Sequence, residues 1–242
     1  VAPAHRHTPT AVRFVIEGEG GYTTVNGEKC PMHKGDLILT PALNWHEHGH
    51  EGSGPVIWMD ALDLPMIYAM EASYAIEGPS QPVRPEADAS QNKYRRAGLL
   101  PYASLGRAQR ADYPQIRYPW VDVRQALAAL ATVTPKDEAV QLAYVNPETG
   151  RPCLPTLGFS AMQLRAGQDL ALRKRSASGV IHVIEGRGES EIDGVTLQWT
   201  EGDTLTIPTH AQVRHRAMGN DAYLFHVDDA PMQRALGIYE DF

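Results

Sequence analysis

The stretch Val-Ile-Glu-Gly-Glu-Gly at residues 15–20 returns as Val-Ile-Glu-Gly-Arg-Gly at residues 183–188, and this repeat decides the expected fold. A Gly-Asp pair follows the first copy at Gly35 and the second copy at Gly202. Each of these glycines is followed six residues later by a proline. Landmarks that keep their order and nearly keep their spacing indicate an internal duplication of the chain.

Each copy has the pattern of short β-strands between glycine-rich turns. Residues 13–16 and 181–184 are apolar and largely β-branched, and glycine-rich segments end them. Residues 36–40 and 203–207 form a second matched pair, each stopped by a proline. Many short strands with turn signals are typical of a β-sandwich or jelly roll. We therefore predict a mainly β protein made of two copies of one barrel.

The middle of the chain differs from both copies. Residues 78–92 are rich in proline, serine, glutamine and aspartate, which indicates an exposed connection. Residues 122–133 then place apolar side chains on one face of a helix, and Pro135 ends the pattern. The predicted parts are an N-terminal barrel over 1–77, a partly helical linker over 78–153 and a C-terminal barrel over 154–242.

Composition excludes several classes of partner. The formal net charge is −7, and the lysines and arginines form no block, which argues against binding to nucleic acid or to an anionic membrane surface. A run of about eighteen apolar residues, which a membrane-spanning helix needs, does not occur in the sequence. Cys30 and Cys153 are the only cysteines, so a disulfide framework is not expected and a reducing cytoplasmic setting is favoured.

The histidines are the candidate metal ligands. His5 and His7 are two residues apart, so in a strand both rings point to the same side. His46, five residues after Pro41, can supply a third imidazole from a distant strand. The chain has ten histidines, so the pair alone is weak evidence, and two surface histidines are the alternative.

The repeat strengthens the case for a metal. In the second copy the positions that match the three histidines hold Arg173, Arg175 and Val213. Unrelated histidines are not expected to disappear as a set, whereas ligands of one ion are. We therefore predict one metal ion per chain, in the first barrel, and none in the second.

The start of the sequence bears on this site. The chain begins at Val1 without a signal-peptide pattern, and the first candidate ligand follows only four residues later. A strand of a β-barrel needs neighbouring strands to pair with, so we expect further residues to precede Val1.

These motifs resemble those of known families. His5-x-His7, the glycine-rich stretch at 15–20, Gly35-Asp36 and the histidine five residues after Pro41 resemble the two conserved motifs of the cupin superfamily. Cupins commonly carry a glutamate four or five residues after the second histidine, where this chain has Ala11 and Val12. The set of three histidines and the amino-acid sequences of residues 5–14 and 58–65 are similar to those of the gentisate 1,2-dioxygenase family. That family includes salicylate and 1-hydroxy-2-naphthoate dioxygenases.

The resemblance implies a fold, a cofactor and a reaction. The fold would be a double-stranded β-helix, duplicated as a bicupin, in a cytoplasmic homotetramer. The cofactor would be one Fe(II) per chain, held by His5, His7 and His46, because three neutral imidazoles leave positions open for substrate oxygens and O2. The reaction would be ring cleavage of gentisate to maleylpyruvate with both atoms of O2, in aromatic catabolism.

Other functions stay open at this stage. The nearest alternative is the same chemistry on salicylate or 1-hydroxy-2-naphthoate. A second class is a metal-dependent cupin isomerase or hydrolase that acts on sugar-like acids without O2. A third is a non-catalytic binding or storage bicupin, against which the retained set of three histidines argues.

Three further residues are candidates for the substrate pocket. Arg13 lies an even number of residues after the histidine pair and can face the same interior; the resemblance implies that it grips the substrate carboxylate. The alternative is a structural salt bridge with Asp60. The resemblance assigns Asp60 and His48 to the pocket as well. The alternative for Asp60 is a charged strand end. For His48 it is a structural role, because the second copy retains His215 at the matching position.

Overall fold

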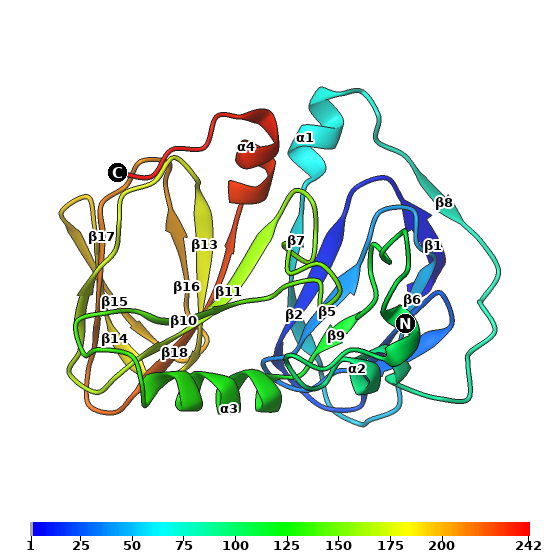
Figure 1. The fold of residues 1–242 in the computed structure, drawn as a ribbon, viewed down its shortest axis with the longest axis horizontal. Helices are drawn as coiled ribbons and strands as arrows, with labels where there is room; N and C mark the ends of the chain where they lie inside the picture. Colours follow the sequence, from blue (N-terminus) through cyan, green and yellow to red (C-terminus); the bar gives the residue numbers. More distant parts are fainter. Residues whose placement is uncertain (1) are drawn as a thin grey trace. The chain divides into compact units, whose positions relative to one another are not determined.

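The computed structural model describes residues 2–242 and divides the chain into two compact units (Figure 1). The first unit comprises the chain up to Asp122 together with Val145–Leu154. The second comprises Val123–Tyr144 and Pro155–Phe242. The segment 78–153, predicted as a linker, is divided between these two units.

The first unit is built from two antiparallel sheets. One has the strand order β4-β3-β6-β1-β8 and the other β7-β2-β5-β9. The strands are β1 Ala2–His7, β2 Ala11–Glu17, β3 Gly21–Val25, β4 Glu28–Pro31, β5 Leu37–Thr40, β6 His46–His50, β7 Ile57–Leu62, β8 Ala75–Glu77 and β9 Arg117–Tyr118. The helical segments are α1 Leu64–Ala69, α2 Ala89–Lys93 and the 3-10 turn η1 Tyr102–Ser104.

The second unit repeats this plan. Its sheets have the orders β10-β11-β18-β13-β16 and β12-β17-β14-β15. The strands are β10 Val140–Ala143, β11 Gly158–Leu164, β12 Asp169–Ala171, β13 Gly179–Glu185, β14 Arg187–Ile192, β15 Val195–Thr200, β16 Thr204–Ile207, β17 Val213–Ala217 and β18 Ala222–Asp228. Helix α4 spans Ala230–Leu236, and α3 spans Trp120–Ala131.

The predicted elements are confirmed in both copies. The four matched segments lie in β2, β13, β5 and β16, and the predicted helix is α3, which begins two residues earlier than expected.

The Gly-Asp landmark also has a physical reason in the first copy. Gly35 has φ +83°, and a Cβ atom there would lie 2.5 Å from Cγ of Trp120. Asp36 accepts hydrogen bonds from the backbone N–H of Trp120 at 2.9 Å and from Nε of Arg117 at 2.8 Å.

Each unit has its own apolar core. In the first, Val15 and Ile38 are fully buried beside Met32 and Cys30. In the second, Val183, which matches Val15, is equally buried. Both cysteines are free buried thiols, as expected from their number and spacing.

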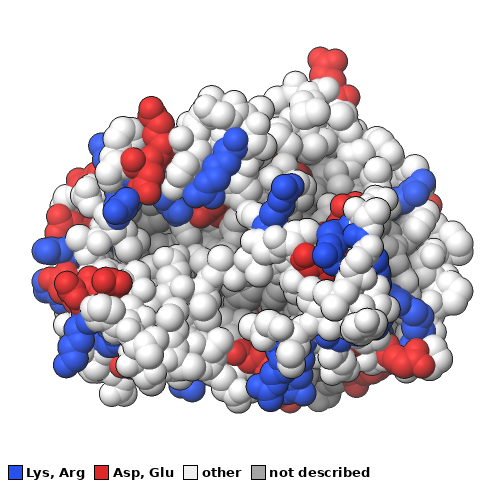
Figure 2. Space-filling view, viewed as in Figure 1, with Lys and Arg blue, Asp and Glu red and all other residues white. Residues whose placement is uncertain are grey.

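The surface carries charges of both signs. On the face drawn in Figure 2, acidic and basic side chains stand in small mixed groups, which agrees with the absence of a basic block from the sequence. Among residues 2–242, every helix is too short or too polar to cross a bilayer.

Candidate metal centre

Two neighbouring strands of the first unit, β1 and β6, carry the candidate ligands. His5 is the Cα partner of His46, and the register shifts between this pair and the pair of Ala2 with His48. Side chains two residues apart on a strand share a face, so His5 and His7 face together from β1, and His46 and His48 from β6. The burial of β6 agrees, because His46 and His48 are buried while the residue between them is partly exposed.

The four imidazoles of His5, His7, His46 and His48 form one group, the histidine cluster. The ring centroid of His46 lies 4.3 Å from that of His5 and 4.8 Å from that of His7. The centroids of His5 and His7 are 5.7 Å apart. His48 stands farther out, 5.7 Å from His46 and 6.0 Å from His5 by ring centroids.

Two sets of three imidazoles from this cluster are candidate ligand sets, and both contain His5 and His46. Ring nitrogens of His5, His46 and His48 all lie within 4.8 Å of one another. The set predicted from the sequence has His7 in place of His48 and has the closer ring centroids.

Hydrogen bonds of the rings distinguish the two sets. In the predicted set each Nδ1 lies against a backbone carbonyl two residues away: His5 to Pro3 at 2.8 Å, His7 to Pro9 at 2.7 Å and His46 to Asn44 at 2.9 Å. A carbonyl oxygen only accepts, so Nδ1 carries the proton and Nε2 presents its lone pair. Histidines that bind metals are typically held in this way. Nδ1 of His48 instead faces a hydroxyl, Oγ1 of Thr23, at 3.0 Å.

The residues present fit a metal ion. Nε2 of His46 and Nε2 of His48 are buried and have no hydrogen-bond partner within the described chain. An unpaired buried nitrogen costs roughly 1–3 kcal/mol, which a bound cation removes. Burial lowers the pKa of His46 to about 3 and also lowers the pKa of His7. Both rings are therefore neutral at neutral pH, which is the form that binds a metal.

His48 is held firmly within the cluster. Its side chain is buried, and burial, followed by the charge of Arg13, lowers its pKa to about 2. Oγ1 of Thr23 lies 3.0 Å from Nδ1 of His48 and 3.7 Å from Sδ of Met32. The ring of Trp58 lies 6.1 Å away by centroids. His48 thus lies beside His46 and on the same side of its strand, at the position predicted from the sequence.

Arg13 and Asp60 lie together on the facing sheet of the same unit. They are Cα partners on β2 and β7, and Nε of Arg13 is 3.5 Å from Oδ1 of Asp60. The guanidinium also lies 5.7 Å from the ring centroid of Trp58, and Nη1 is 3.5 Å from Oγ1 of Thr40. Burial lowers the pKa of Arg13, and Asp60 opposes that shift. The salt bridge considered as an alternative is therefore a contact of the structure.

This contact leaves Arg13 with spare donors. Its side chain is 8% exposed, whereas that of Asp60 is 38% exposed. Nε of Arg13 makes no hydrogen bond within residues 2–242. A buried guanidinium has five N–H groups and cannot shed its charge, so a second anion would complete its surroundings.

Sequence reasoning missed the residues that hold His48. Thr23 pairs with His48 across β3 and β6, and Met32 lies behind the Thr23 hydroxyl. The repeat contains a signal for this pair. The shift along the chain that relates His48 to His215 also relates Thr23 to Ser190, a second small hydroxyl residue.

Comparisons with known proteins agree with this geometry. A family model described as a cupin domain matches residues 1–62. A gentisate 1,2-dioxygenase of Ralstonia sp is 49% identical over 99% of this chain and 67% of its own length. A 5-aminosalicylate 1,2-dioxygenase of Comamonas sp is 39% identical over 99% of this chain and 65% of its own length.

A solved structure shows the same fold. The salicylate 1,2-dioxygenase of Pseudoaminobacter salicylatoxidans, in its adduct with gentisate, superimposes with a TM-score of 0.90 at 31% sequence identity. The match covers 99% of this chain and 68% of that one. Identity of this extent, with the cupin motif and two barrels of one plan, establishes that the chain belongs to the gentisate 1,2-dioxygenase family.

Proposed function

We propose that this protein is an Fe(II)-dependent dioxygenase that opens the ring of gentisate to give maleylpyruvate. One observation carries the proposal: three imidazoles converge, and each is held by a backbone carbonyl with its Nε2 lone pair free. The gentisate 1,2-dioxygenase from Ralstonia and the gentisate adduct of the salicylate enzyme support the substrate. The cleaved bond joins the carboxyl-bearing carbon to the adjacent hydroxyl-bearing carbon.

His5, His7 and His46 would hold the iron. Three neutral imidazoles on one side of an octahedral ion resemble the facial triad of non-haem iron oxygenases, with a histidine in place of the carboxylate. When bound, Fe(II) supplies Lewis acidity toward the substrate oxygens and the redox chemistry that O2 requires. The protein's own contribution is to position the aromatic acid against that centre.

Arg13 and His48 would provide this positioning. The guanidinium of Arg13 binds the substrate carboxylate, and Asp60 holds the guanidinium from its exposed side. Nε2 of His48, which is buried and unpartnered within the described residues, hydrogen-bonds the substrate hydroxyl next to that carboxylate. This bond orients the hydroxyl, and the low pKa of His48 keeps its ring neutral, so that Nε2 acts as a hydrogen-bond acceptor.

Oxygen consumption by the Fe(II)-loaded protein tests the proposal. Gentisate, salicylate and 1-hydroxy-2-naphthoate are compared as substrates, and gentisate is expected to give the highest kcat/KM. A preference for either other acid would move the assignment to the alternative substrate within the same chemistry. Absence of O2 uptake with all three acids would favour an isomerase, a hydrolase or a binding protein.

Metal analysis of the intact protein should give one iron per chain. The joint replacement of the three histidines by Arg173, Arg175 and Val213 motivates this number. The protein is first reconstituted with Fe(II) without oxygen, because affinity order alone does not favour Fe(II) over zinc. Two ions per chain would contradict the expected metal-free second barrel.

We also propose that the protein assembles as a homotetramer in the cytoplasm. The family resemblance supports this assembly, and the retention of a second barrel without the three ligands is consistent with a structural role for it. Light scattering of the intact protein should give the mass of four chains. A sharp monomeric species would contradict the proposal.

Replacing Arg13 by alanine should mainly weaken substrate binding. A charge-assisted bidentate contact contributes about 1.5–3 kcal/mol, which corresponds to roughly ten- to a hundredfold in affinity. KM for gentisate should rise by about this factor, with normal iron content. Arg6→Ala is the matched control. It also removes a guanidinium from the first unit, but this one stacks on Trp45, 5.0 Å from the ring centroid. Failure of Arg13→Ala to fold would instead support the structural salt bridge.

A further inference from the structure

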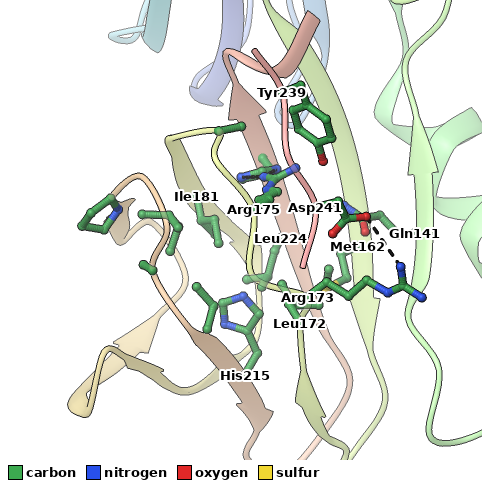
Figure 3. Close-up of a pocket in the computed structure, with 16 residues that line it drawn as sticks. Gln141, Met162, Leu172, Arg173, Arg175, Ile181, His215, Leu224, Tyr239 and Asp241 are labelled. Carbon is green, nitrogen blue, oxygen red and sulfur yellow. Dashed lines mark hydrogen bonds and ion pairs between the residues drawn. The ribbon is translucent and has the colours of Figure 1, made fainter. Parts of the chain in front are cut away.

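The second unit contains a partly open cavity of about 290 Å³ in the barrel that lacks the three histidines (Figure 3). Its walls are largely apolar, with side chains from Met162, Leu172, Ile181, Ile207, Val213 and Leu224. Its polar lining includes Arg175 and His215, which Figure 3 places on two sides of Leu224. The volume is close to the lower limit of ordinary small-molecule sites, which begin at about 300 Å³.

His215 lines this cavity and carries a buried ring nitrogen without a partner among the described residues. The side chain is fully buried, and its Nε2 has no partner among the described residues. Its Nδ1 lies 2.7 Å from Oγ of Ser190, which accepts a hydrogen bond from Nε1 of Trp199 at 2.8 Å. Because an indole N–H only donates, the serine is free to give its own proton to Nδ1 of His215. The proton of the neutral ring then sits on Nε2, and the buried N–H lacks an acceptor.

The matching residues of the first copy allow the opposite arrangement. Thr23 and Ser190 occupy equivalent positions opposite their histidines, His48 and His215. The residue that contacts the hydroxyl differs between the copies. In the first copy it is Met32, whose sulfur is a weak acceptor, and in the second it is Trp199, whose indole N–H is a donor. This one difference allows Ser190 to donate to Nδ1 of His215, which leaves the ring proton on Nε2. The second barrel therefore offers a group suited to an oxygen acceptor and not to a metal ion.

Arg175 provides a positive charge at the same cavity. Its Nη2 donates to Nε2 of His226 at 2.9 Å, and its Nη1 pairs with Asp228 at 3.0 Å. Burial, followed by the charge of Arg175, lowers the pKa of His226 to about 3, so that ring is neutral and accepts. These bonds use two of the five guanidinium N–H groups. The guanidinium is thus held in place with donors to spare.

The remaining charges lie near the rim. Arg173 pairs with Asp241 at 3.7 Å, and their side chains are 81% and 41% exposed. Asp241 is the one carboxylate among the residues that line the cavity, whereas Asp228 is outside that lining. The lining therefore holds two guanidinium groups against one carboxylate.

From these contacts we propose that the second barrel binds a small carboxylic acid with an apolar body of about the size of benzoate. Arg175 binds the carboxylate, His215 donates to an oxygen of the acid, and the apolar walls enclose the rest. An acid of this kind supplies the acceptor that the buried N–H lacks and the anion that the guanidinium favours. The proposal does not depend on ring cleavage in the first barrel.

Crystals of the intact protein soaked with 4-bromobenzoate test it directly. This acid has no hydroxyl group for ring cleavage, so it is not consumed. The anomalous signal of bromine is expected inside the second barrel, with the carboxylate against Arg175. Bromine found in the first barrel alone, or nowhere, would overturn the proposal.

Calorimetric titration with 4-bromobenzoate distinguishes a real site from binding at crystal concentration only. Arg175→Gln and His215→Leu should each weaken the second-barrel binding by about tenfold or more, the effect of one lost charge-assisted or buried hydrogen bond. Arg214→Gln is the matched control, because Arg214 pairs with Asp169 and does not line the cavity.

Circular dichroism and thermal unfolding establish which of the variants fold. Folded variants that bind as tightly as the unaltered protein overturn the proposal, and so does bromine in the crystal without measurable binding in solution. If neither variant folds, the position of bromine in the crystal of the unaltered protein decides alone.

Discussion

His46→Ala should lose the metal ion and the ring-cleaving activity together. His46 is the buried member of the proposed ligand set, and its Nε2 has no partner within the described chain. His7→Ala should behave in the same way, because the carbonyl of Pro9 fixes His7 with its Nε2 lone pair free. Iron per chain is measured by elemental analysis after Fe(II) loading and desalting.

A control and a rival assignment sharpen this experiment. His50→Ala, at the exposed end of the same strand, should keep both iron and turnover. The alternative ligand set contains His48 in place of His7. Iron retained in His7→Ala but lost in His48→Ala would establish that set and contradict the proposed one.

His48→Ala should keep its iron and lose most of its turnover. The group that orients the substrate hydroxyl is removed, while the three proposed ligands stay in place. Misplacement of a reacting group by about 1 Å can lower the rate by about 10²-fold. We expect kcat to fall by about this factor, and single-turnover measurements on the iron-loaded variant would show the loss in the chemical step.

Thr23→Val offers a graded companion to this variant. It keeps the shape of the side chain and removes the hydroxyl that lies 3.0 Å from Nδ1 of His48. The ring stays in the pocket but is held less firmly, so kcat should fall less than in His48→Ala. Near-normal kcat in His48→Ala would show instead that the residue only packs the barrel.

The fold was predictable because its signals are local and occur twice. In each copy an apolar segment followed by a glycine-rich turn predicts a strand, and these strands are β2 and β13. The unit boundaries were not predictable, because they depend on pairing between distant segments. β9 pairs with β5 in the first unit, while β10 pairs with β11 in the second. Both strands come from the segment expected to be a linker.

The sequence was sufficient to predict which histidines lie together, but not how their ring atoms are held. Alternation along the strands placed His5 with His7 and His46 with His48, as the structure shows. Two of the carbonyls that fix the ring protons, those of Pro9 and Asn44, belong to irregular backbone beside the strands, whose course a residue pattern does not specify. The Arg13–Asp60 pair depends on the register of β2 against β7, which a single sequence does not fix.

The mass of the product formed from gentisate tests the central claim most directly. The iron-loaded protein is supplied with gentisate and 18O2. The reaction is quenched rapidly, and the mass of the product is measured by mass spectrometry. A dioxygenase that opens the ring gives one product, heavier than gentisate by a whole molecule of O2, with both added atoms labelled. A product that carries a single added oxygen atom, or gentisate recovered unchanged while the iron site is full, would contradict the account.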